Sequence, residues 1–390
     1  MECLTVKRLF LIFFCLIIIC ASSFGQSGSI PVSYNRPGAK ARAMGQTFIG
    51  ISDDASAVDY NPSGLIQIQN PEISAELKYT FEKHNNHLPV SSFNNGRASH
   101  NNFDDDYFTP SFFGFVYPFE KFTLALSEYS SINFEHSFTD KDSVPIPFRY
   151  KQNLEMQLNH IALSGAYSIS SWLDVGATIK AGEFYLYRMN SNYISDYKQN
   201  TRTSDSDKDD VYGYNLGLML KPLDSLSIGL VYKSEEDADI EIASNRYDYD
   251  LPQYVGLGLN YKINERWNIA ADVDWTEWSE FDKTNSYNMN TGGTQLRWKR
   301  DDVISYHFGT EYKPDIFENI STPLRFGYYY QPTTSAYDTI NVPFTIEDNV
   351  DDEHHFTTGF GMYWNIFQID FAVDYSEDKT DLLLSSVIKF

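Results

Sequence analysis

The last ten residues of the chain, DLLLSSVIKF, constrain its fold more than any other stretch. Alternate side chains of a strand lie on one face, and one face of this stretch is apolar except for a single serine. It consists of Phe390, Ile388, Ser386, Leu384 and Leu382. A final strand with one apolar face and a terminal aromatic residue is typical of a bacterial outer-membrane β-barrel. Because only helices and closed barrels satisfy every backbone polar group within lipid, this strand predicts a closed barrel.

The same alternation recurs along most of the chain. In WNIAADVDWTEW, for example, Trp267, Ile269 and Val273 share one face while Asp272 and Asp274 share the other. Fourteen such segments are expected, at about residues 72–83, 107–118, 121–137, 148–169, 172–188, 211–222, 225–240, 252–263, 266–280, 297–313, 322–335, 354–365, 367–376 and 381–390. The pattern therefore predicts an all-β protein whose residues 71–390 form a 14-stranded antiparallel transmembrane β-barrel.

The connections between these segments support the same fold. From the second segment on, every second connection is short: PFEK, SISS, PLDS, KINER, the longer PDIFENIST, and NIF. The other connections are mostly long and polar, as in NSNYISDYKQNTRTSDSDKDD. Short periplasmic turns that alternate with long outer loops are typical of an outer-membrane barrel.

Residues 1–25 have the pattern of a secretory signal peptide. Lys7 and Arg8 precede the apolar run LFLIFFCLIIIC, and Ser23 and Gly25 suit a cut before Gln26. The apolar run is too short to span a bilayer comfortably. All three cysteines (Cys3, Cys15 and Cys20) lie in this leader, so the mature chain is predicted to contain no disulfide, catalytic thiol or cysteine-ligated metal.

The charge of the mature chain bears on its partners. The 30 basic and 53 acidic residues include Lys7, Arg8 and Glu2 of the leader, so 28 basic and 52 acidic residues remain and the net charge is −24. Such an acidic chain is not expected to bind nucleic acid. Aromatic residues make up 16% of the chain, which argues against disorder and fits the aromatic girdles of a barrel.

Residues 26–70 precede the first expected strand and lack its alternation. The stretch GAKARAMGQTFIGISDDASAVDYNPSGLIQ is rich in small residues and includes apolar side chains that need a packing partner: Met44, Phe48, Ile49, Ile51, Val58 and Leu65. We expect this segment to fold back into the barrel lumen as a hatch, or plug. The alternative is a loose periplasmic extension.

Several stretches, taken in order, resemble the FadL-type family of outer-membrane transporters for long-chain fatty acids and other hydrophobic compounds. DDASAVDYNPSGL resembles the family's hatch, although its Asn-Pro-Ala signature reads Asn61-Pro62-Ser63 here. The likeness continues through YKSEEDADIEI, LPQYVGLGLNY, DVDWTEWSEFD, WKRDDVISYHFGTEY, LRFGYYYQP and HHFTTGFGMYW. Residues 72–150 match least well.

The resemblance implies a fold and a mechanism. The family has a 14-stranded barrel with an N-terminal hatch, and its members take up hydrophobic molecules passively. The molecule is caught by the outer loops, enters an apolar pocket and leaves through a gap in the barrel wall beside the hatch. The Asn61-Pro62-Ser63 motif would then form a hatch turn, although a purely structural role is the alternative.

In the family, the gap comes from a kink in the third strand. Here the third segment reads FTLALSEYSSINFEHSF. Leu126 is expected to face lipid, and Ile132 and Phe134 are the next apolar residues at the same alternate positions. The same parity would place Glu128 and Ser130 in lipid, which is costly for a carboxylate. Either a bulge shifts the register or the wall opens. The candidate lateral-opening residues are Glu128, Tyr129, Ser130 and Ser131.

A fatty-acid carboxylate would need a cation in the lumen. The lumen-facing parity offers Lys78, Lys180 and Arg325 as candidate carboxylate-binding residues. The same face also holds several acids: Asp272, Asp274, Glu311, Asp370 and Asp374. The alternative is therefore that these cations form ion pairs that hold the strands together.

The sequence predicts that the protein is not an enzyme and that it needs no cofactor and no metal. It contains no Gly-x-Ser-x-Gly elbow and no convincing Ser-His-Asp set. His354 and His355 begin a strand, where neighbouring side chains point to opposite faces, so they are a poor metal-ligand pair. The acidic runs of the outer loops, such as SDSDKDD, are expected to be solvated.

The predicted function is passive uptake of long-chain fatty acids or other hydrophobic molecules across the outer membrane of a Gram-negative bacterium. The expected partners are these molecules, outer-membrane lipid and lipopolysaccharide, and the barrel-assembly machinery through the C-terminal strand. Two alternatives remain open. One is an outer-membrane component of a protein secretion system that uses the barrel as a docking platform. The other is a lipid hydrolase with a Ser-His pair at the barrel rim.

Overall fold

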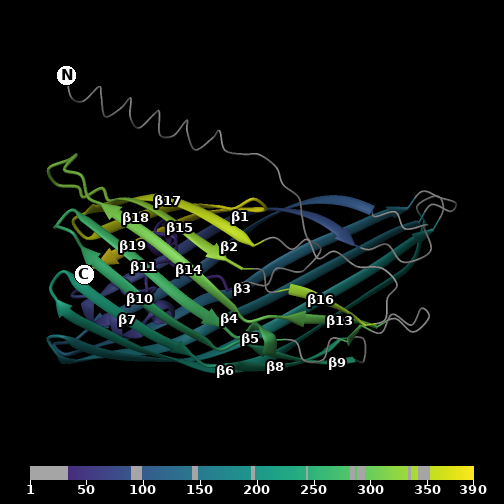
Figure 1. Ribbon diagram of the computed structural model, residues 1–390, viewed down its shortest axis with the longest axis horizontal. Helices are drawn as coiled ribbons and strands as arrows, with labels where there is room; N and C mark the ends of the chain where they lie inside the picture. Colours follow the sequence, from purple (N-terminus) through teal and green to yellow (C-terminus); the bar gives the residue numbers. More distant parts are fainter. Residues whose placement is uncertain are drawn as a thin grey trace, which may run out of the picture.

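The computed structural model describes residues 34–88, 99–142, 148–194, 198–242, 245–281, 286–287, 295–332, 335–340 and 352–390. Within these ranges fourteen antiparallel strands close into one barrel (Figure 1). Their order around the wall is β1-β19-β18-β17-β15-β14-β11-β10-β7-β6-β5-β4-β3-β2. The prediction of an all-β, 14-stranded antiparallel barrel is confirmed. The predicted signal peptide, residues 1–25, lies outside the described residues.

All fourteen barrel strands coincide with expected segments. They are β1 (Glu72–Leu88), β2 (Ser99–Pro118), β3 (Phe122–Asp142), β4 (Phe148–Ser170), β5 (Leu173–Ile194), β6 (Lys198–Leu223), β7 (Leu226–Lys233), β10 (Tyr254–Lys262), β11 (Trp267–Thr276), β14 (Val303–Tyr312), β15 (Leu324–Gln331), β17 (Glu353–Trp364), β18 (Phe367–Tyr375) and β19 (Lys379–Lys389).

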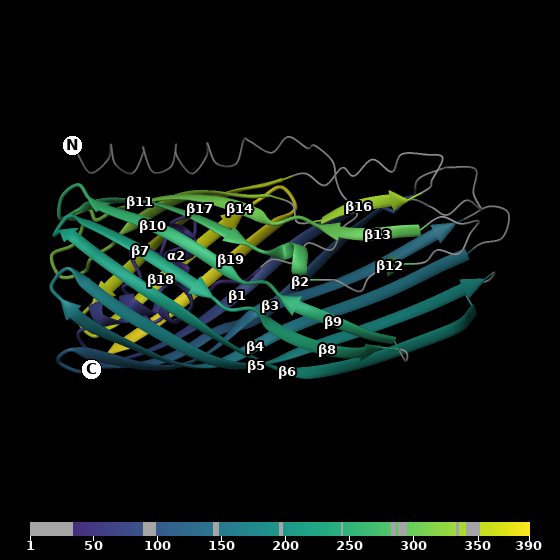
Figure 2. The same cartoon turned by 60° about the horizontal axis from the view of Figure 1, so that its bottom comes forward.

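In the described part of the chain, five further strands lie outside the barrel ladder (Figure 2). β8 (Glu236–Ile242) and β9 (Asn245–Leu251) form a hairpin, and a three-stranded sheet consists of β12 (Ser286–Tyr287), β13 (Gln295–Arg300) and β16 (Ser335–Ile340). The expected segments 225–240 and 297–313 were wrong in joining β7 to β8 and β13 to β14. In the sequence the apolar residues stay at even positions across both junctions, so the alternation does not reveal that the strand changes its partner. In the structure the buried positions change from odd along β7 to even along β8.

The helices of the described chain are short. They are α2 (Ala39–Ala43), α3 (Ala57–Tyr60) and the 3-10 helices η1 (Pro62–Gln67) and η2 (Trp278–Glu280). None of the described helices is long and apolar enough to cross a membrane.

The two faces of the wall differ as the alternation predicted. Along β11, Trp267 and Ile269 are exposed on the outer face, whereas Asp272 and Asp274 are buried on the lumen face. The barrel closes where β1 pairs with β19, in a register that places Ile73 opposite Ile388. The backbone N–H of Phe390 donates to the carbonyl oxygen of Pro71 at 2.8 Å. The expected role of the C-terminal segment as the closing strand is therefore confirmed.

Candidate functional site

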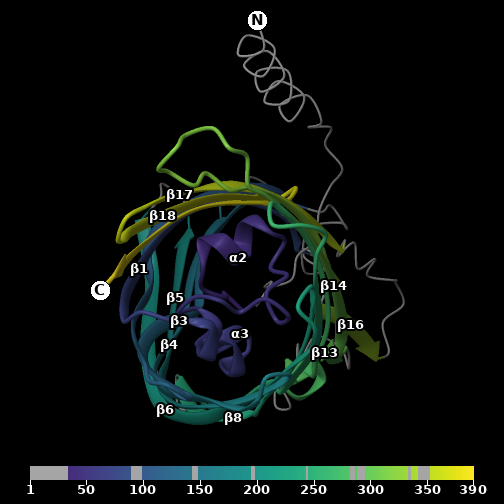
Figure 3. The ribbon, with the colours of Figure 1, turned by 90° about the vertical axis from the view of Figure 1, so that its left-hand side faces the viewer.

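Residues 34–70, here called the inner segment, lie inside the ring of strands, where α2 and α3 are visible in the view along the barrel (Figure 3). All six apolar residues that were expected to need a packing partner are buried there: Met44, Phe48, Ile49, Ile51, Val58 and Leu65. This placement is consistent with a hatch. The assignment of residues 26–70 as a hatch domain stays a prediction.

The Asn61-Pro62-Ser63 motif joins the inner segment to the wall. The fully buried Asn61 side chain donates through Nδ2 to the carbonyl oxygens of Ile49 and Leu218, both at 3.0 Å. Its Oδ1 accepts from the Ser63 hydroxyl at 2.6 Å and from the Ser63 backbone N–H at 3.3 Å. Pro62 begins η1, where its missing N–H costs nothing. The motif therefore ties two turns of the inner segment to β6.

Glycines in the wall make room for this motif. A Cβ atom at Gly176 of β5 would overlap the backbone of Pro62 and Ser63, and one at Gly217 of β6 would overlap the Asn61 side chain. The close approach of two backbones is a common reason for glycine within a strand.

Charges of the inner segment face opposite charges on the wall. Arg42 Nη1 lies 3.0 Å from Asp374 Oδ2, and Arg36 Nη2 lies 3.6 Å from Asp274 Oδ2. Lys233 Nζ lies 2.7 Å from Asp59 Oδ1. Burial alone would raise the pKa of Asp59, but Lys233, with Arg36 and Lys180, outweighs that effect and the pKa is lowered. These pairs hold the inner segment in place, since breaking a buried pair is costly.

The three candidate carboxylate-binding cations all face the lumen, and each has a partner there. Lys180 contacts Glu236, and Lys78 Nζ donates to Asn35 Oδ1 at 2.9 Å. Arg325 forms 2.7 Å ion pairs with two carboxylates, those of Glu311 and Asp370. The ion pairs expected as the alternative are thus present for Lys180 and Arg325. A role in binding a ligand's carboxylate stays a prediction.

The third barrel strand, β3, contains a bulge at Ser131. Its pairing with β4 passes from Ser130 opposite Asn159 directly to Ile132 opposite Leu158. Glu128 remains exposed on the outer face, whereas Ser130 and Ser131 are buried. The register shift corrects one expectation: the next two apolar residues of β3 point into the lumen instead of into lipid. These residues are Ile132 and Phe134.

The same bulge marks the end of pairing between β2 and β3. This pairing runs from Pro118 opposite Thr123 to Phe112 opposite Tyr129 and, over the described residues, no further. β2 remains paired with β1 beyond that point. Pro110 lies just past the last pair and has no N–H to donate, which explains locally why the ladder stops. We call the region between residues 107–111 of β2 and 130–134 of β3 the wall split.

Polar groups cover the split from inside. Asn35 of the inner segment donates its backbone N–H to the Ser131 carbonyl at 2.7 Å and its side-chain amide to the Ser130 carbonyl at 3.0 Å. The two edges are bridged only by side chains in the described region: the Tyr107 hydroxyl donates to the Asn133 carbonyl, and Asn133 Nδ2 donates to Thr109 Oγ1. The carbonyls freed by the bulge are therefore satisfied without a β-ladder.

A large apolar cluster lies on the lumen side of β3–β6 and under the β8–β9 hairpin. β8 alternates strictly, with its apolar residues buried and its acidic residues 237, 239 and 241 exposed. The buried members of the cluster are Ile132, Phe134, Met156, Leu158, Phe184, Leu186, Val211, Ala238, Ile240, Ile242, Tyr249, Leu251, Trp278, Phe281 and Val303. Tyr34 of the inner segment packs against it.

A cavity connects this cluster to the wall split. Ile132 and Phe134 of the cluster and Tyr107 and Asn133 of the split line it, together with Tyr34. The rest of its lining is mostly charged or polar: Asn35, Arg42, Gln46, Lys78, Glu82, Tyr329, Gln331, Glu353, His355, Lys379 and Asp381. Its empty space of about 650 Å³ includes open solvent. Ile132 and Phe134 therefore bring the apolar cluster to the edge of β3, beside a mostly polar cavity.

Ser131, His160 and Glu236 form a buried chain of hydrogen bonds that the sequence analysis missed. The Ser131 hydroxyl lies 2.8 Å from His160 Nδ1, and His160 Nε2 lies 2.7 Å from Glu236 Oε2. The other oxygen of Glu236 contacts Lys180. β3, β4 and β5 follow one another in sequence, but Glu236 lies on β8, where the buried positions change from odd, as in β7, to even, so the alternation does not signal the contact. The prediction that the protein is not an enzyme is kept.

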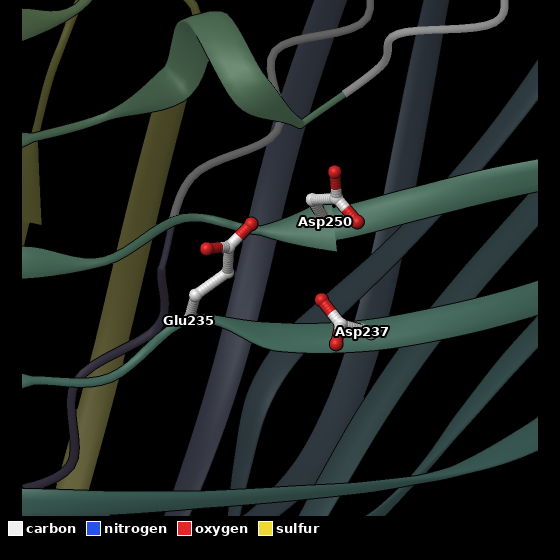
Figure 4. Close-up of side chains that lie close together, drawn as sticks. All are labelled: Glu235, Asp237 and Asp250. Atoms are coloured by element: carbon white, nitrogen blue, oxygen red, sulfur yellow. The ribbon is translucent and has the colours of Figure 1, made fainter.

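One group of carboxylates in the described chain has the spacing of a metal site. Glu235, Asp237 and Asp250 offer oxygens within 4.8 Å of one another where the β8–β9 hairpin leaves the barrel (Figure 4). Glu235 and Asp237 are exposed and Asp250 is half-buried. Exposed acidic groups are common without an ion, so we assign no metal to this group, and the prediction of no metal site is kept.

Known proteins of one family share this fold. Residues 18–383 match the family described as "Outer membrane protein transport protein (OMPP1/FadL/TodX)". The fold is similar to a Pseudomonas aeruginosa FadL homologue, with a TM-score of 0.64 and 13% identity over 94% of this chain and 100% of that one. It is also similar to the Ralstonia pickettii toluene transporter TbuX, with a TM-score of 0.60 and 15% identity over 94% and 100%. The P. putida toluene transporter TodX gives a TM-score of 0.59 and 14% identity over 91% and 98%. A search of curated proteins found no match.

Proposed function

Because the chain belongs to the FadL/TodX family of outer-membrane transport proteins, we propose that it admits hydrophobic molecules passively through the apolar cluster and the wall split. The protein is an outer-membrane β-barrel of a Gram-negative bacterium. In the proposed route, a molecule enters beneath the β8–β9 hairpin, passes Ile132 and Phe134, and leaves sideways between β2 and β3.

The observation that carries this proposal is that two apolar residues belong at once to the cluster, the cavity and the split. Ile132 and Phe134 belong to the apolar cluster, line the cavity and lie on the edge strand of the split. A molecule that buries about 200 Å² of apolar surface there gains about 5 kcal/mol. A water-filled pore offers no such stabilisation. Passage through the wall would deliver the molecule past the polar outer leaflet.

Two classes of hydrophobic molecule are candidates for the substrate. Two similar structures are titled toluene transporters and another a FadL homologue, so monoaromatic hydrocarbons and long-chain fatty acids are both candidates. We propose further that the outer loops contact lipopolysaccharide. The exposed Phe390, which ends the closing strand, is proposed to be read by the barrel-assembly machinery. The family consists of transport channels, and no covalent chemistry or cofactor is proposed.

The proposal is tested by uptake of labelled toluene and labelled palmitate into a deletion strain that carries wild-type or variant protein. Ile240→Asn puts a polar amide into the cluster and should reduce uptake, whereas Asp239→Asn changes the exposed face of the same strand and should not. Both variants must reach the membrane in equal amounts. Equal uptake by the deletion strain and the wild type would overturn the proposal. Stable protein partners in that case would favour the docking platform.

A further inference from the structure

The apolar cluster ends, on three neighbouring strands, in charged or polar residues of the same parity. On β4, Met156 and Leu158 are followed by His160. On β5, Leu186 and Phe184 lead past Gly182 to Lys180, and on β8 the buried face runs from Ile242 and Ile240 through Ala238 to Glu236. We call His160, Lys180 and Glu236 the floor of the cluster.

Two wall glycines make space for the floor. A Cβ atom at Gly182 would lie 2.7 Å from the His160 ring, and one at Gly213 would lie within 2.9 Å of both Glu236 and Lys180. The three side chains of the floor are each more than nine-tenths buried. They therefore meet in a recess of the wall that excludes water.

Within this recess the charges cancel. Glu236 uses one carboxylate oxygen for Lys180 and the other for His160 Nε2, at 2.7 Å. His160 Nδ1 lies 2.8 Å from the Ser131 hydroxyl, which can donate to it. A neutral imidazole that donates to Glu236 and accepts from Ser131 satisfies every member. The floor then carries one positive and one negative charge, already paired.

The neighbouring cations are paired as well. Lys233 faces Asp59, and Arg36 faces Asp274. Among the described residues at this end of the cluster, a ligand's carboxylate would therefore find each of these cations matched to an acid. It would also lie beside the carboxylate of Glu236. An uncharged ligand would leave the pairs undisturbed, while an unpaired buried anion is strongly disfavoured.

We propose that Glu236 is a specificity-determining residue: by neutralising Lys180, it makes the cluster select uncharged hydrophobic molecules over fatty-acid anions. This inference rests on the proposed function, because it assumes that the ligand occupies the apolar cluster. It assigns hydrocarbons, alcohols and esters as the substrate class.

The test compares two probes that differ only in their end group: 9,10-dibromostearic acid and the corresponding alcohol. Bromine quenches tryptophan at short range, and Trp278 lies within the cluster. Binding to purified protein in detergent is measured well above the pKa of a carboxylic acid. The Trp278→Phe variant gives the background from the other tryptophans. The wild type should bind the alcohol at least about tenfold more tightly than the acid.

Glu236→Gln leaves Lys180 charged and without its carboxylate, so the acid-to-alcohol preference should shift toward the acid by about tenfold or more. Adding Lys180→Met to that variant removes the freed cation and should restore the preference for the alcohol. Glu311→Gln is the matched control, because Glu311 is a similarly buried partner of Arg325 outside the cluster and its loss should leave the ratio unchanged.

Equal binding of acid and alcohol by the wild type would overturn the inference, even if no variant folds. An unchanged ratio in folded Glu236→Gln would overturn it as well. If neither probe quenches Trp278, the cluster is not the binding site and the proposed function fails instead. The two failures are therefore distinguishable.

Discussion

Replacing Asn61 with alanine should release the inner segment from the barrel wall. The Asn61 side chain is fully buried and makes four hydrogen bonds, two donated to the carbonyls of Ile49 and Leu218 and two accepted from Ser63. Alanine removes all four and leaves buried carbonyls and a hydroxyl without these partners. At a net contribution of about 1 kcal/mol or somewhat less for each bond, the seated state should lose about 2–4 kcal/mol.

Hydrogen exchange measures this loss directly. The amides of Phe48 and Ile49 donate to Asp272 Oδ2 at 2.8 and 2.9 Å, so their exchange requires the inner segment to leave the wall. A loss of about 2–4 kcal/mol should speed exchange of peptides covering residues 44–66 by about 30- to 700-fold. Ser63→Ala, which removes one hydroxyl bond, should speed it only about fivefold.

The barrel strands should keep their wild-type exchange in both variants, because their ladders are unchanged. If Asn61→Ala leaves exchange of residues 44–66 at the wild-type rate, the motif does not anchor the inner segment. If the barrel strands exchange faster to the same extent, the motif stabilises the whole fold instead of seating one segment.

Two further predictions concern the same segment. Gly176→Ala should unseat it, because a Cβ atom there overlaps the backbone of Pro62 and Ser63. Gly165→Ala should be tolerated, because its Cβ atom would make an ordinary 3.6 Å contact. The expected result is faster hydrogen exchange of residues 44–66 in the Gly176→Ala variant alone. Burial raises the pKa of Asp54 to about 6, above its value in an unfolded chain, so ionised Asp54 opposes seating at neutral pH. Protection of the inner segment from hydrogen exchange should then increase as the pH falls from about 7 to about 4. The Asp54→Asn variant should show a smaller increase, because it lacks the carboxyl group that titrates. An identical pH dependence in both proteins would contradict this reading.

The wall of the barrel could be predicted from the sequence because lipid and lumen impose opposite demands on alternate residues. That pattern identified all fourteen barrel strands and placed Lys78, Lys180 and Arg325 in the lumen. It could not identify β8 as a separate strand, because the apolar residues stay at even positions, as Leu230 and Ile240 do, although these face outward along β7 and inward along β8.

The candidate site was predicted only in part. The disturbed parity around Glu128 located the irregular region of β3, but the direction of the register shift depends on one unpaired residue, Ser131, and so Ile132 and Phe134 were assigned to the wrong face. Pro110 was the available signal that β2 loses its ladder at this point. Asn35, His160 and Glu236 act through contacts between distant segments, which no local pattern reveals.

The wall split can be tested most directly by closing it. All three cysteines lie at or before residue 20, in the predicted leader, so an introduced pair in the mature chain has no competitor. Thr109→Cys with Asn133→Cys spans the split where those two side chains now hydrogen-bond, and Val116→Cys with Ala125→Cys spans the paired part of the same two strands as a control. With both disulfides fully formed, uptake of a labelled hydrophobic substrate should stop in the first variant, recover on reduction, and continue in the control. Undiminished uptake through the closed split would contradict lateral passage.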